Sequence, residues 1–281
     1  MPALVAVGCG LVVACAIVAF VARYPALDPS APRVRRETIT ENTPVVAGFV
    51  RTRLNPEAIT GLLLTTALAL VLGATIAIGA LFFMAQHNAL LAHYDLSAAR
   101  WGAHHATTAS TQWLRRISLF GGTPFMIAAS ISVAVIEYAR SRLASVFGFL
   151  LAVVLGQVLL TNFTKWIVDR PRPAIHRLTG FSGASFPSGH AATAAATFAA
   201  LAFLLGRARR TNIKALLAGL AAGIAVTVAA SRVFLGVHWF TDVLAGLALG
   251  WGWFALCSIA FGGRVLRFGR PVEIAESVSA P

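Results

Sequence analysis

Three short polar segments carry the side chains of this chain that could do chemistry. They read KWIVDRPRP at residues 165–173, FPSGH at residues 186–190 and SRVFLGVHWFTD at residues 231–242. Together they hold several cations, two histidines and a carboxylate close to one of the histidines. This combination suits phosphoryl transfer, because negative charge on the oxygens of the transferred group must be stabilised by cations.

The first segment is expected to end a helix and release an arginine into the loop that follows. Pro171 and Pro173 cannot continue a helix, so Arg172 should leave it on extended chain while Lys165 stays in the last turn. Asp169 lies four residues after Lys165, on the same helical face, and we expect it to pair with Lys165 or Arg170.

The second segment has the pattern of a helix N-terminus that could receive a phosphate. Ser188 is a favoured N-cap residue, and Gly189 would let the backbone approach a ligand closely. The free N–H groups of such a first turn bind anions, and His190 stands in this turn. Taken alone, the segment fits an ordinary capped helix with an interfacial histidine equally well.

The third segment contains a histidine and an aspartate four residues apart. On a helix His238 and Asp242 would share one face, and the carboxylate would fix the imidazole tautomer and raise the basicity of the other nitrogen. A purely structural pair is the alternative for this segment by itself.

Combined, the segments predict a division of roles around one phosphoryl group. His238 would attack in line, and His190 would protonate the departing oxygen. The phosphoryl oxygens would be held by three cations, Lys165, Arg172 and Arg232. The sequence has no Asp/Glu cluster with metal-ligand spacing, so we expect a reaction that needs neither Mg²⁺ nor another cofactor.

The composition places these segments in a membrane protein. Of 281 residues, 58% are hydrophobic and only 12% are charged, with a mean hydropathy of +0.77. A soluble domain carries about twice that share of charge. The predicted fold class is all-α, a polytopic membrane helix bundle, with seven uncharged runs that are candidate spans: Ala3–Ala22, Gly61–Ala85, Ile117–Ile136, Leu143–Thr164, Ala191–Gly206, Ala215–Ser231 and Val243–Gly263.

The spans predict four parts of the chain. Residues 1–22 form an extra N-terminal transmembrane helix, and residues 23–59 form a polar linker. Residues 60–263 form a six-helix core, and residues 264–281 form a tail. An uncleaved anchor is favoured over a cleaved signal peptide for the first helix, because no Lys or Arg precedes it and its apolar run is long.

The net charge of +13 is best explained by topology. Fifteen basic residues fall on the side of the linker and tail, against eight on the side of the three polar segments. By the positive-inside rule the linker and tail are cytoplasmic, and the three segments face outward from a plasma membrane. This account needs no nucleic-acid partner.

Four smaller features complete the sequence predictions. Cys9, Cys15 and Cys257 lie in apolar runs and are expected to be buried and free of disulfides.

Residues 95–116 mix tryptophans with polar side chains and could lie flat at the membrane interface. The adjacent His104 and His105 are not expected to bind metal. The GxxxG patterns at residues 219–223 and 246–250 favour helix packing within the chain over dimerisation.

The three motifs together resemble the type 2 phosphatidic acid phosphatase superfamily, which is related to vanadium haloperoxidases and bacterial acid phosphatases. The matching patterns are Lys165-x6-Arg172-Pro173, Pro187-Ser188-Gly189-His190 and Ser231-Arg232-x5-His238-x3-Asp242, within a resemblance that covers about residues 60–262. It implies a phosphohistidine at His238, oriented by Asp242, with His190 as general acid and then base. It also implies a metal-independent reaction at the extracytoplasmic face, with the phosphate held by Lys165, Arg172, Ser188, Gly189 and Arg232.

The resemblance implies a membrane lipid phosphatase, with the lipid and the bilayer as its partners. Undecaprenyl pyrophosphate is the preferred substrate, followed by phosphatidic acid and phosphatidylglycerol phosphate. Two alternatives stay open: phosphotransfer from lipid to lipid, and a non-enzymatic binder or transporter of anionic lipids. A binder would need the cations but not the pair of His238 and Asp242. A haloperoxidase is disfavoured because the chain is a membrane protein, and the sequence leaves the oligomeric state open.

Overall fold

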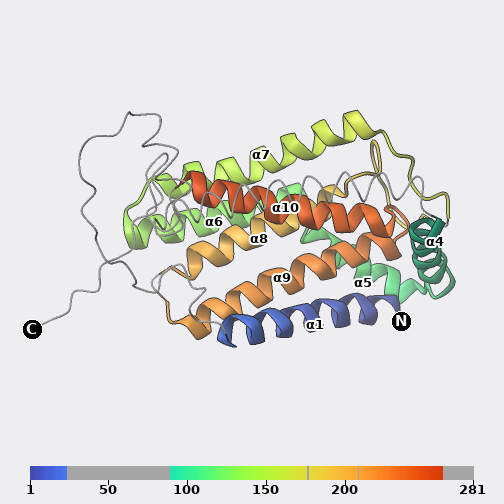
Figure 1. The fold of residues 1–281 in the computed structure, drawn as a ribbon, viewed down its shortest axis with the longest axis horizontal. Helices are drawn as coiled ribbons and strands as arrows, with labels where there is room; N and C mark the ends of the chain where they lie inside the picture. The colour runs from blue at the N-terminus through green and yellow to red at the C-terminus, as the bar shows by residue number, and fades with distance from the viewer. Residues whose placement is uncertain (24–88, 176, 208, 262–281) are drawn as a thin grey trace, which may run out of the picture.

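The computed structural model describes residues 1–23, 89–175, 177–207 and 209–261, and within these ranges the chain forms eight α-helices and no strand (Figure 1). The prediction of an all-α membrane bundle is thereby confirmed. The helices are α1 (Pro2–Arg23), α4 (Ala89–His104), α5 (Thr108–Leu119), α6 (Thr123–Ser141), α7 (Ser145–Val168), α8 (Gly189–Leu205), α9 (Thr211–Phe234) and α10 (Phe240–Ala260).

Helix α8 forms the centre of the bundle and contacts α6, α7, α9 and α10. Most of its buried residues are alanines, which let the neighbouring helices approach closely. A Cβ at Gly246 of α10 would lie 2.6 Å from the carbonyl oxygen of Ser188, and one at Gly250 would meet that of Ala192. These two glycines therefore pack α10 against α8 within one chain, as predicted.

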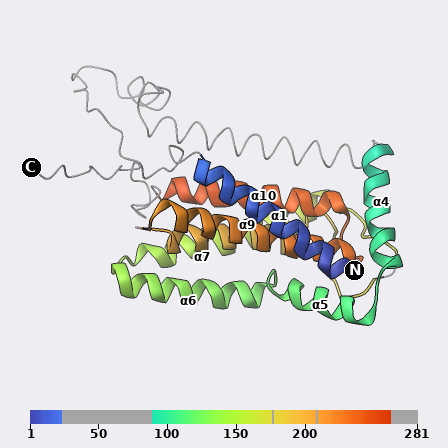
Figure 2. The same ribbon diagram turned by 90° about the horizontal axis from the view of Figure 1, so that it is seen from below.

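Helix α1 packs along α9 on the outside of this arrangement (Figure 2). A Cβ at Gly223 would lie 2.7 Å from the carbonyl oxygen of Gly10, and one at Gly219 would lie 2.7 Å from that of Ala14. The other GxxxG pattern therefore also mediates packing within the chain, where it lets α9 approach α1, the first predicted span.

The third predicted span, Ile117–Ile136, is wrong in its start. Helix α5 ends at Leu119, α6 begins at Thr123, and the two are bent by 46°. Gly121 and Gly122 weaken the helix here, and Pro124 in the first turn of α6 supplies a new start. Gly121 also packs against α8, because a Cβ there would lie 3.0 Å from the carbonyl oxygen of His190.

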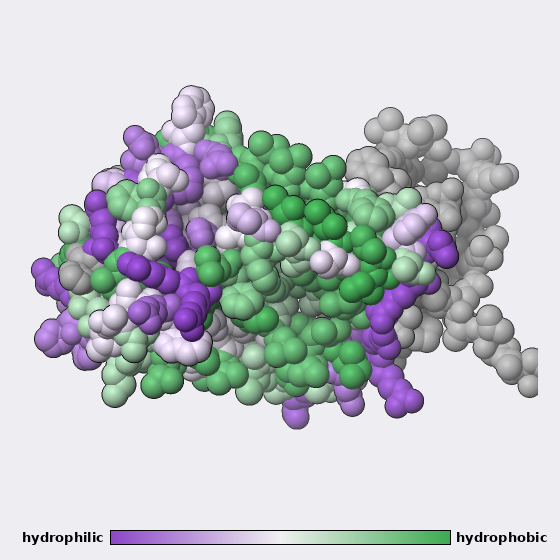
Figure 3. Space-filling model, turned by 180° about the vertical axis from the view of Figure 1, so that it is seen from behind, coloured by the Kyte–Doolittle hydropathy of each residue, from purple (hydrophilic) through white to green (hydrophobic). Residues whose placement is uncertain are grey.

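Four of the described helices, α1, α7, α9 and α10, are long and apolar enough to cross a membrane, and the bent pair of α5 and α6 makes up to five. Helix α8 is apolar but shorter, with 17 residues. One face of α7 exposes Leu151, Leu155, Leu159 and Phe163. Figure 3 shows a hydrophobic belt between two more hydrophilic ends. The protein is therefore a multi-pass membrane protein.

Helix α4 lies across one end of the bundle (Figure 2). Trp101 of α4 packs on Phe234 at the end of α9, with ring centroids 5.3 Å apart. The expectation that residues 95–116 lie flat therefore fits α4 but fails for α5, which runs beside α9 and leads into α6.

The structure corrects the prediction for the cysteines, and three further predictions concern residues that it does not describe. All three cysteines are free, but only Cys257 is buried, because Cys9 and Cys15 are on the outward face of α1. The predicted span at residues 61–85, the linker after Arg23 and the tail at residues 264–281 lie outside the described residues.

Candidate active site

The three polar segments meet at the end of the bundle that α4 covers. Helices α7 and α9 run toward this end, while α8 and α10 start from it. Lys165 and Arg232 are therefore in the last turns of their helices, His190 is in the first turn of α8, and His238 is in the connection before α10. Antiparallel neighbours bring residues that are distant in sequence to one place.

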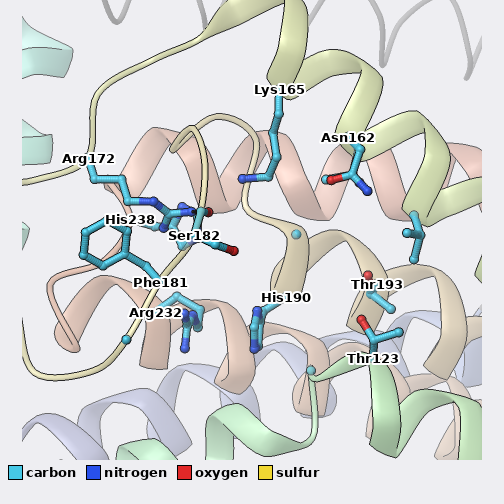
Figure 4. A pocket seen from close by; sticks show the side chains of 15 residues that line it. Thr123, Asn162, Lys165, Arg172, Phe181, Ser182, His190, Thr193, Arg232 and His238 are labelled. Carbon is cyan, nitrogen blue, oxygen red and sulfur yellow. Dashed lines mark hydrogen bonds between the residues drawn. The ribbon is translucent and has the colours of Figure 1, made fainter.

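A cavity of about 500 Å³ lies between these segments (Figure 4). Six of the eight predicted site residues line it: Lys165, Arg172, Gly189, His190, Arg232 and His238. Ser188 and Asp242 do not line it, and both are fully buried. The cavity therefore presents three cations and two histidines, while the carboxylate stands behind them.

His238 is only 2% exposed, and its Nδ1 lies 3.6 Å from Oδ2 of Asp242. This separation is slightly longer than a hydrogen bond. With Nδ1 toward the carboxylate, Nε2 faces the cavity. Burial lowers the pKa of His238 to about 4, while Asp242 opposes this effect and the cations Arg172 and Arg232 add to it. The imidazole is therefore neutral near pH 7, as a nucleophile must be.

The pair of His238 and Asp242 differs from the prediction in its local structure. Helix α10 begins at Phe240, with Trp239 as its N-cap, so His238 precedes the helix. Asp242 is in the first turn, where Oδ2 accepts a hydrogen bond from the backbone N–H of Trp239 at 2.9 Å. The carboxylate thus caps its own helix while it faces the imidazole, and a shared helical face is not what brings the two together.

Ser188 is the N-cap residue of α8, as predicted, but its side chain makes no capping hydrogen bond. Its Oγ is buried and has no hydrogen-bond partner within the described part of the chain. Its backbone N–H donates to the carbonyl oxygen of Asp242 at 3.0 Å, which ties α8 to α10. A Cβ at Gly189 would make only an ordinary contact, 3.7 Å from Thr161, so protein packing does not require glycine there.

Arg172 is held by the loop that precedes α8. Its Nε donates to Gly183 at 2.9 Å, and its Nη2 donates to the carbonyl oxygens of Ser182 and Ala184 at 2.8 and 3.0 Å. Lys165 also donates to the carbonyl oxygen of Ala184. Burial lowers the pKa of Arg172, which nonetheless stays charged. Two of the predicted phosphate ligands, Lys165 and Arg172, therefore donate to the same carbonyl oxygen, that of Ala184.

Arg232 is oriented by a helix that the motifs do not include. It is 6% exposed, and its Nη1 donates to Oγ of Ser118 on α5 at 2.6 Å. Its Nε is buried without a hydrogen-bond partner within the described residues. One side of the guanidinium is therefore fixed by protein, and the residue itself lines the cavity.

The predicted pairing of Asp169 is wrong. Asp169 is the left-handed C-cap residue of α7, with φ of 40°, and its side chain is exposed. The helix ends before Asp169 can stack on Lys165. Arg170 instead forms ion pairs with Asp95 and Asp242, at 2.9 and 2.5 Å.

Comparisons with known proteins agree with this arrangement. A sequence model described as the PAP2 superfamily matches residues 145–265. A lipid A 1-phosphatase from Rhizobium etli is 32% identical over 192 residues, which cover 60% of this chain and 78% of that protein. The chain belongs to the PAP2 superfamily.

Two further PAP2 proteins extend the likeness. Phosphatidylglycerophosphatase B from Bacillus subtilis is 38% identical over 128 residues, covering 43% of this chain and 61% of that protein. A crystal structure of a transmembrane PAP2 type phosphatidylglycerolphosphate phosphatase from Bacillus subtilis superposes with a TM-score of 0.61 at 27% identity, covering 68% of this chain and 94% of that one. The predicted family and its class of enzyme, a membrane lipid phosphatase, are confirmed.

Sequence reasoning missed part of the surroundings of the PAP2 motifs. Asp95, Arg170, Ser185 and Thr241 all hydrogen-bond to one another or to Asp242. Arg170 lies inside the first motif, but its spacing from Lys165 and Arg172 did not indicate that it contacts Asp242. Asp95 comes from α4, outside the region that the family model matches. Only a fold can show that such distant residues touch.

Groups of three or more His, Cys, Asp or Glu side chains that could hold a metal ion do not occur within the described ranges. His104 and His105 meet edge to face, with ring centroids 5.1 Å apart, and His105 stacks on Trp101 at 4.6 Å. A packing role explains the contacts of His105.

Proposed function

We propose that this chain hydrolyses a phosphate or pyrophosphate ester of a membrane lipid through a phosphohistidine at His238. The observation that carries the proposal is the cavity that His238 and His190 line together with three cations, with Asp242 beside His238. A site for lipid binding alone would not need a neutral, carboxylate-backed histidine opposite a second one. The family and its named relatives support the same chemistry.

The first step transfers the phosphoryl group to the protein. Nε2 of His238 attacks phosphorus while the bond to the leaving oxygen breaks, and protonated His190 gives that oxygen its proton. Burial and the nearby cations lower the pKa of His190 to about 3, and the negative charge of the bound phosphate raises it again and favours the protonated ring. Asp242 compensates the positive charge that develops on the imidazole. Lys165, Arg172 and Arg232 stabilise the equatorial oxygens, together with the hydroxyl of Ser188 and the backbone N–H of Gly189.

The second step returns the protein to its starting state. His190, now deprotonated, accepts a proton from a water molecule that attacks phosphorus. The bond between phosphorus and Nε2 of His238 breaks, and inorganic phosphate leaves. In both reaction steps, side chains of this chain transfer the protons and stabilise the charge on the phosphoryl oxygens. The proposal therefore requires neither a metal ion nor a cofactor.

The substrate class is a phosphorylated lipid headgroup at the membrane surface. The relatives bear names that specify lipid A and phosphatidylglycerophosphate. Undecaprenyl pyrophosphate and phosphatidic acid remain candidates from the motif pattern. Only residues 174–186 separate the first motif from the second, which leaves little chain for a cover above the cavity. Entry of the lipid sideways from the bilayer fits this short connection.

Release of inorganic phosphate by the detergent-purified full chain in excess EDTA tests the proposal. The panel holds undecaprenyl pyrophosphate, phosphatidic acid, phosphatidylglycerol phosphate, lipid A and a soluble phosphomonoester. We expect release from at least one lipid and a loss of at least about 10⁴-fold in His238→Ala, as for removal of a catalytic nucleophile. His105→Ala, a histidine away from the cavity, serves as the matched control.

A folded His238→Ala protein that keeps its turnover would overturn the nucleophile assignment. Quenching in alkaline detergent with ³²P-labelled lipid adds a direct measurement, because a phosphohistidine is stable in base and loses its label on later acidification. A second acceptor lipid in the reaction separates hydrolysis from transfer. Label that appears only in the acceptor, with no inorganic phosphate, would replace hydrolysis by lipid-to-lipid phosphotransfer.

A further inference from the structure

Arg170 forms a charged bridge behind the cavity, between two buried carboxylates. Its Nη1 donates to Oδ1 of Asp242 at 2.5 Å, and its Nη2 donates to Oδ2 of Asp95 at 2.9 Å. The three side chains are 10%, 0% and 3% exposed. Charged groups this well buried are found in proteins only where they are paired or serve a function.

We propose that Asp95 and Arg170 are positioning residues that hold Asp242, and through it His238, in place for the reaction. The inference rests on the proposed role of His238. It goes beyond that role because it assigns to α4, which carries Asp95, a part in positioning the reacting residues. Neither residue lines the cavity.

Asp95 acts on the start of α10 as well as on Arg170. Its Oδ1 accepts a hydrogen bond from the backbone N–H of Thr241 at 2.8 Å, and its Oδ2 accepts one from the hydroxyl of Thr241 at 2.8 Å. The N–H groups of the first helical turn lack partners within the helix, and a carboxylate there is favoured by the helix dipole. A residue of α4 therefore caps the helix that carries Asp242.

The position of Arg170 is fixed from several sides. Its Nη1 also donates to Oγ1 of Thr241 at 2.8 Å, and its guanidinium lies 5.7 Å from the ring centroid of Trp239. Its backbone carbonyl accepts a hydrogen bond from the N–H of Ser185 at 2.8 Å. The planar fork of an arginine can serve two carboxylates at once, which a lysine cannot do.

The two carboxylate oxygens of Asp242 have different partners. Oδ1 accepts from Arg170, while Oδ2 accepts from the Ser185 hydroxyl and the Trp239 N–H and faces Nδ1 of His238. Loss of the Arg170 contact would free the carboxylate to rotate away from the imidazole. Replacing Arg170 by a neutral residue would also remove a positive charge near His238.

Three variants separate charge from packing. Asp95→Asn keeps an oxygen for the Thr241 N–H but places an amide donor against Arg170. Arg170→Gln removes the cation, and Arg170→Lys keeps the charge without the fork. Asp169→Asn is the matched control, because Asp169 is exposed beside Arg170 and asparagine tolerates its left-handed backbone.

Steady-state kinetics on the full chain give the first readout. We expect kcat to fall about tenfold to a hundredfold in Asp95→Asn and Arg170→Gln with KM nearly unchanged, as for the outer partners of metal-bound histidines. Arg170→Lys should recover part of the loss, and Asp169→Asn should match the wild type. A folded Asp95→Asn protein with wild-type kcat, or one in which only KM changes, would overturn the proposal.

The pH dependence of His238 gives a readout that a merely structural tie would not produce. The charged or titratable groups around its ring are Asp242, Arg172, Arg232 and His190, and none is altered in these variants. Arg170→Gln removes positive charge, so the acid limb of kcat/KM should move to higher pH. Asp95→Asn removes negative charge, so the limb should move to lower pH. A shift to lower pH in both variants would show that Asp242 has moved away from His238, as loss of a positioning residue also allows, whereas the absence of any shift in both variants would overturn the proposal.

The ring ¹⁵N signal of His238, titrated in detergent and assigned by its loss in His238→Gln, follows the same shifts without turnover. A wild-type chain that releases no phosphate from any lipid would defeat the proposed function. The opposite shifts of the ¹⁵N titration would still support the positioning pair in that case, and the absence of any shift in both variants would overturn it.

Discussion

Nη1 of Arg172 lies 3.2 Å from Nε2 of His238. The same nitrogen donates to the carbonyl oxygen of Val237 at 2.7 Å. If Nδ1 carries the imidazole proton, the Nε2 lone pair accepts from the arginine. The proposed nucleophile and one of the proposed phosphate ligands are therefore in direct contact.

Arg172→Lys tests this double role. A lysine cannot reproduce the hydrogen bonds to residues 182–184 and to His238 together, since its ammonium is a single point donor. We expect kcat/KM to fall about tenfold to a hundredfold, the usual range for one or two charge-assisted hydrogen bonds. Hydrogen exchange at residues 180–185 should become faster at the same time.

Lys165→Gln is the comparison for this prediction, because Lys165 contacts the same loop only through Ala184. It should lower kcat/KM with a smaller effect on hydrogen exchange. Unchanged exchange in a folded Arg172→Lys protein would show that the arginine does not hold the loop.

Ser188→Ala should separate activity from stability. The Oγ is buried without a hydrogen-bond partner in the described structure, so its removal should leave the melting temperature in detergent unchanged or raise it. If the hydroxyl turns to the phosphate during the reaction, kcat/KM falls about tenfold or more, as for one hydrogen bond to a charged group.

Ser185→Ala gives the contrast for Ser188. The Ser185 hydroxyl donates to Asp242, so its loss should lower both the melting temperature and kcat. A Ser188→Ala protein with wild-type kcat/KM would remove Ser188 from the proposed phosphate ligands.

The lowered pKa of His238 predicts a loss of stability in mild acid. Burial lowers the pKa of His238 to about 4 in the folded protein, whereas the unfolded chain has the ordinary pKa of 6.5. Between these values the unfolded state binds more protons, so the free energy of unfolding falls as the pH drops from about 6.5 to 4. At about 1.36 kcal/mol for each unit, the whole window is worth on the order of 3 kcal/mol.

Thermal unfolding of the wild type and His238→Gln across this window isolates the contribution. Glutamine does not titrate, so its melting temperature should fall less steeply with decreasing pH. Parallel curves for the two proteins would mean that His238 is not buried in its neutral form.

The charge distribution predicts which side of the membrane holds the cavity. In a chain whose native cysteines are replaced by alanine, Ala174→Cys near the cavity should react with an impermeant maleimide in intact cells. Arg209→Cys, in the connection between α8 and α9, should react only after lysis, because fifteen of the basic residues gather on its side. The reverse pattern would place the cavity in the cytoplasm.

The sequence by itself determined the family of this protein, its class of enzyme and the class of its fold. Uncharged runs of membrane-spanning length leave few arrangements other than a helix bundle, because backbone groups in lipid must be satisfied within each helix. The motif residues were readable because their spacing reflects local structure, such as the proline stop after Lys165 and the helix start at Ser188.

Tertiary structure decided how those residues are supported. Asp95 reaches Arg170 and Thr241 because α4 lies across the end of the bundle, and Ser118 reaches Arg232 because α5 bends away from α6. Contacts between residues far apart in the chain leave no spacing pattern in one sequence. The same reason explains the wrong pairing of Asp169: which carboxylate meets a buried arginine depends on how the helices pack.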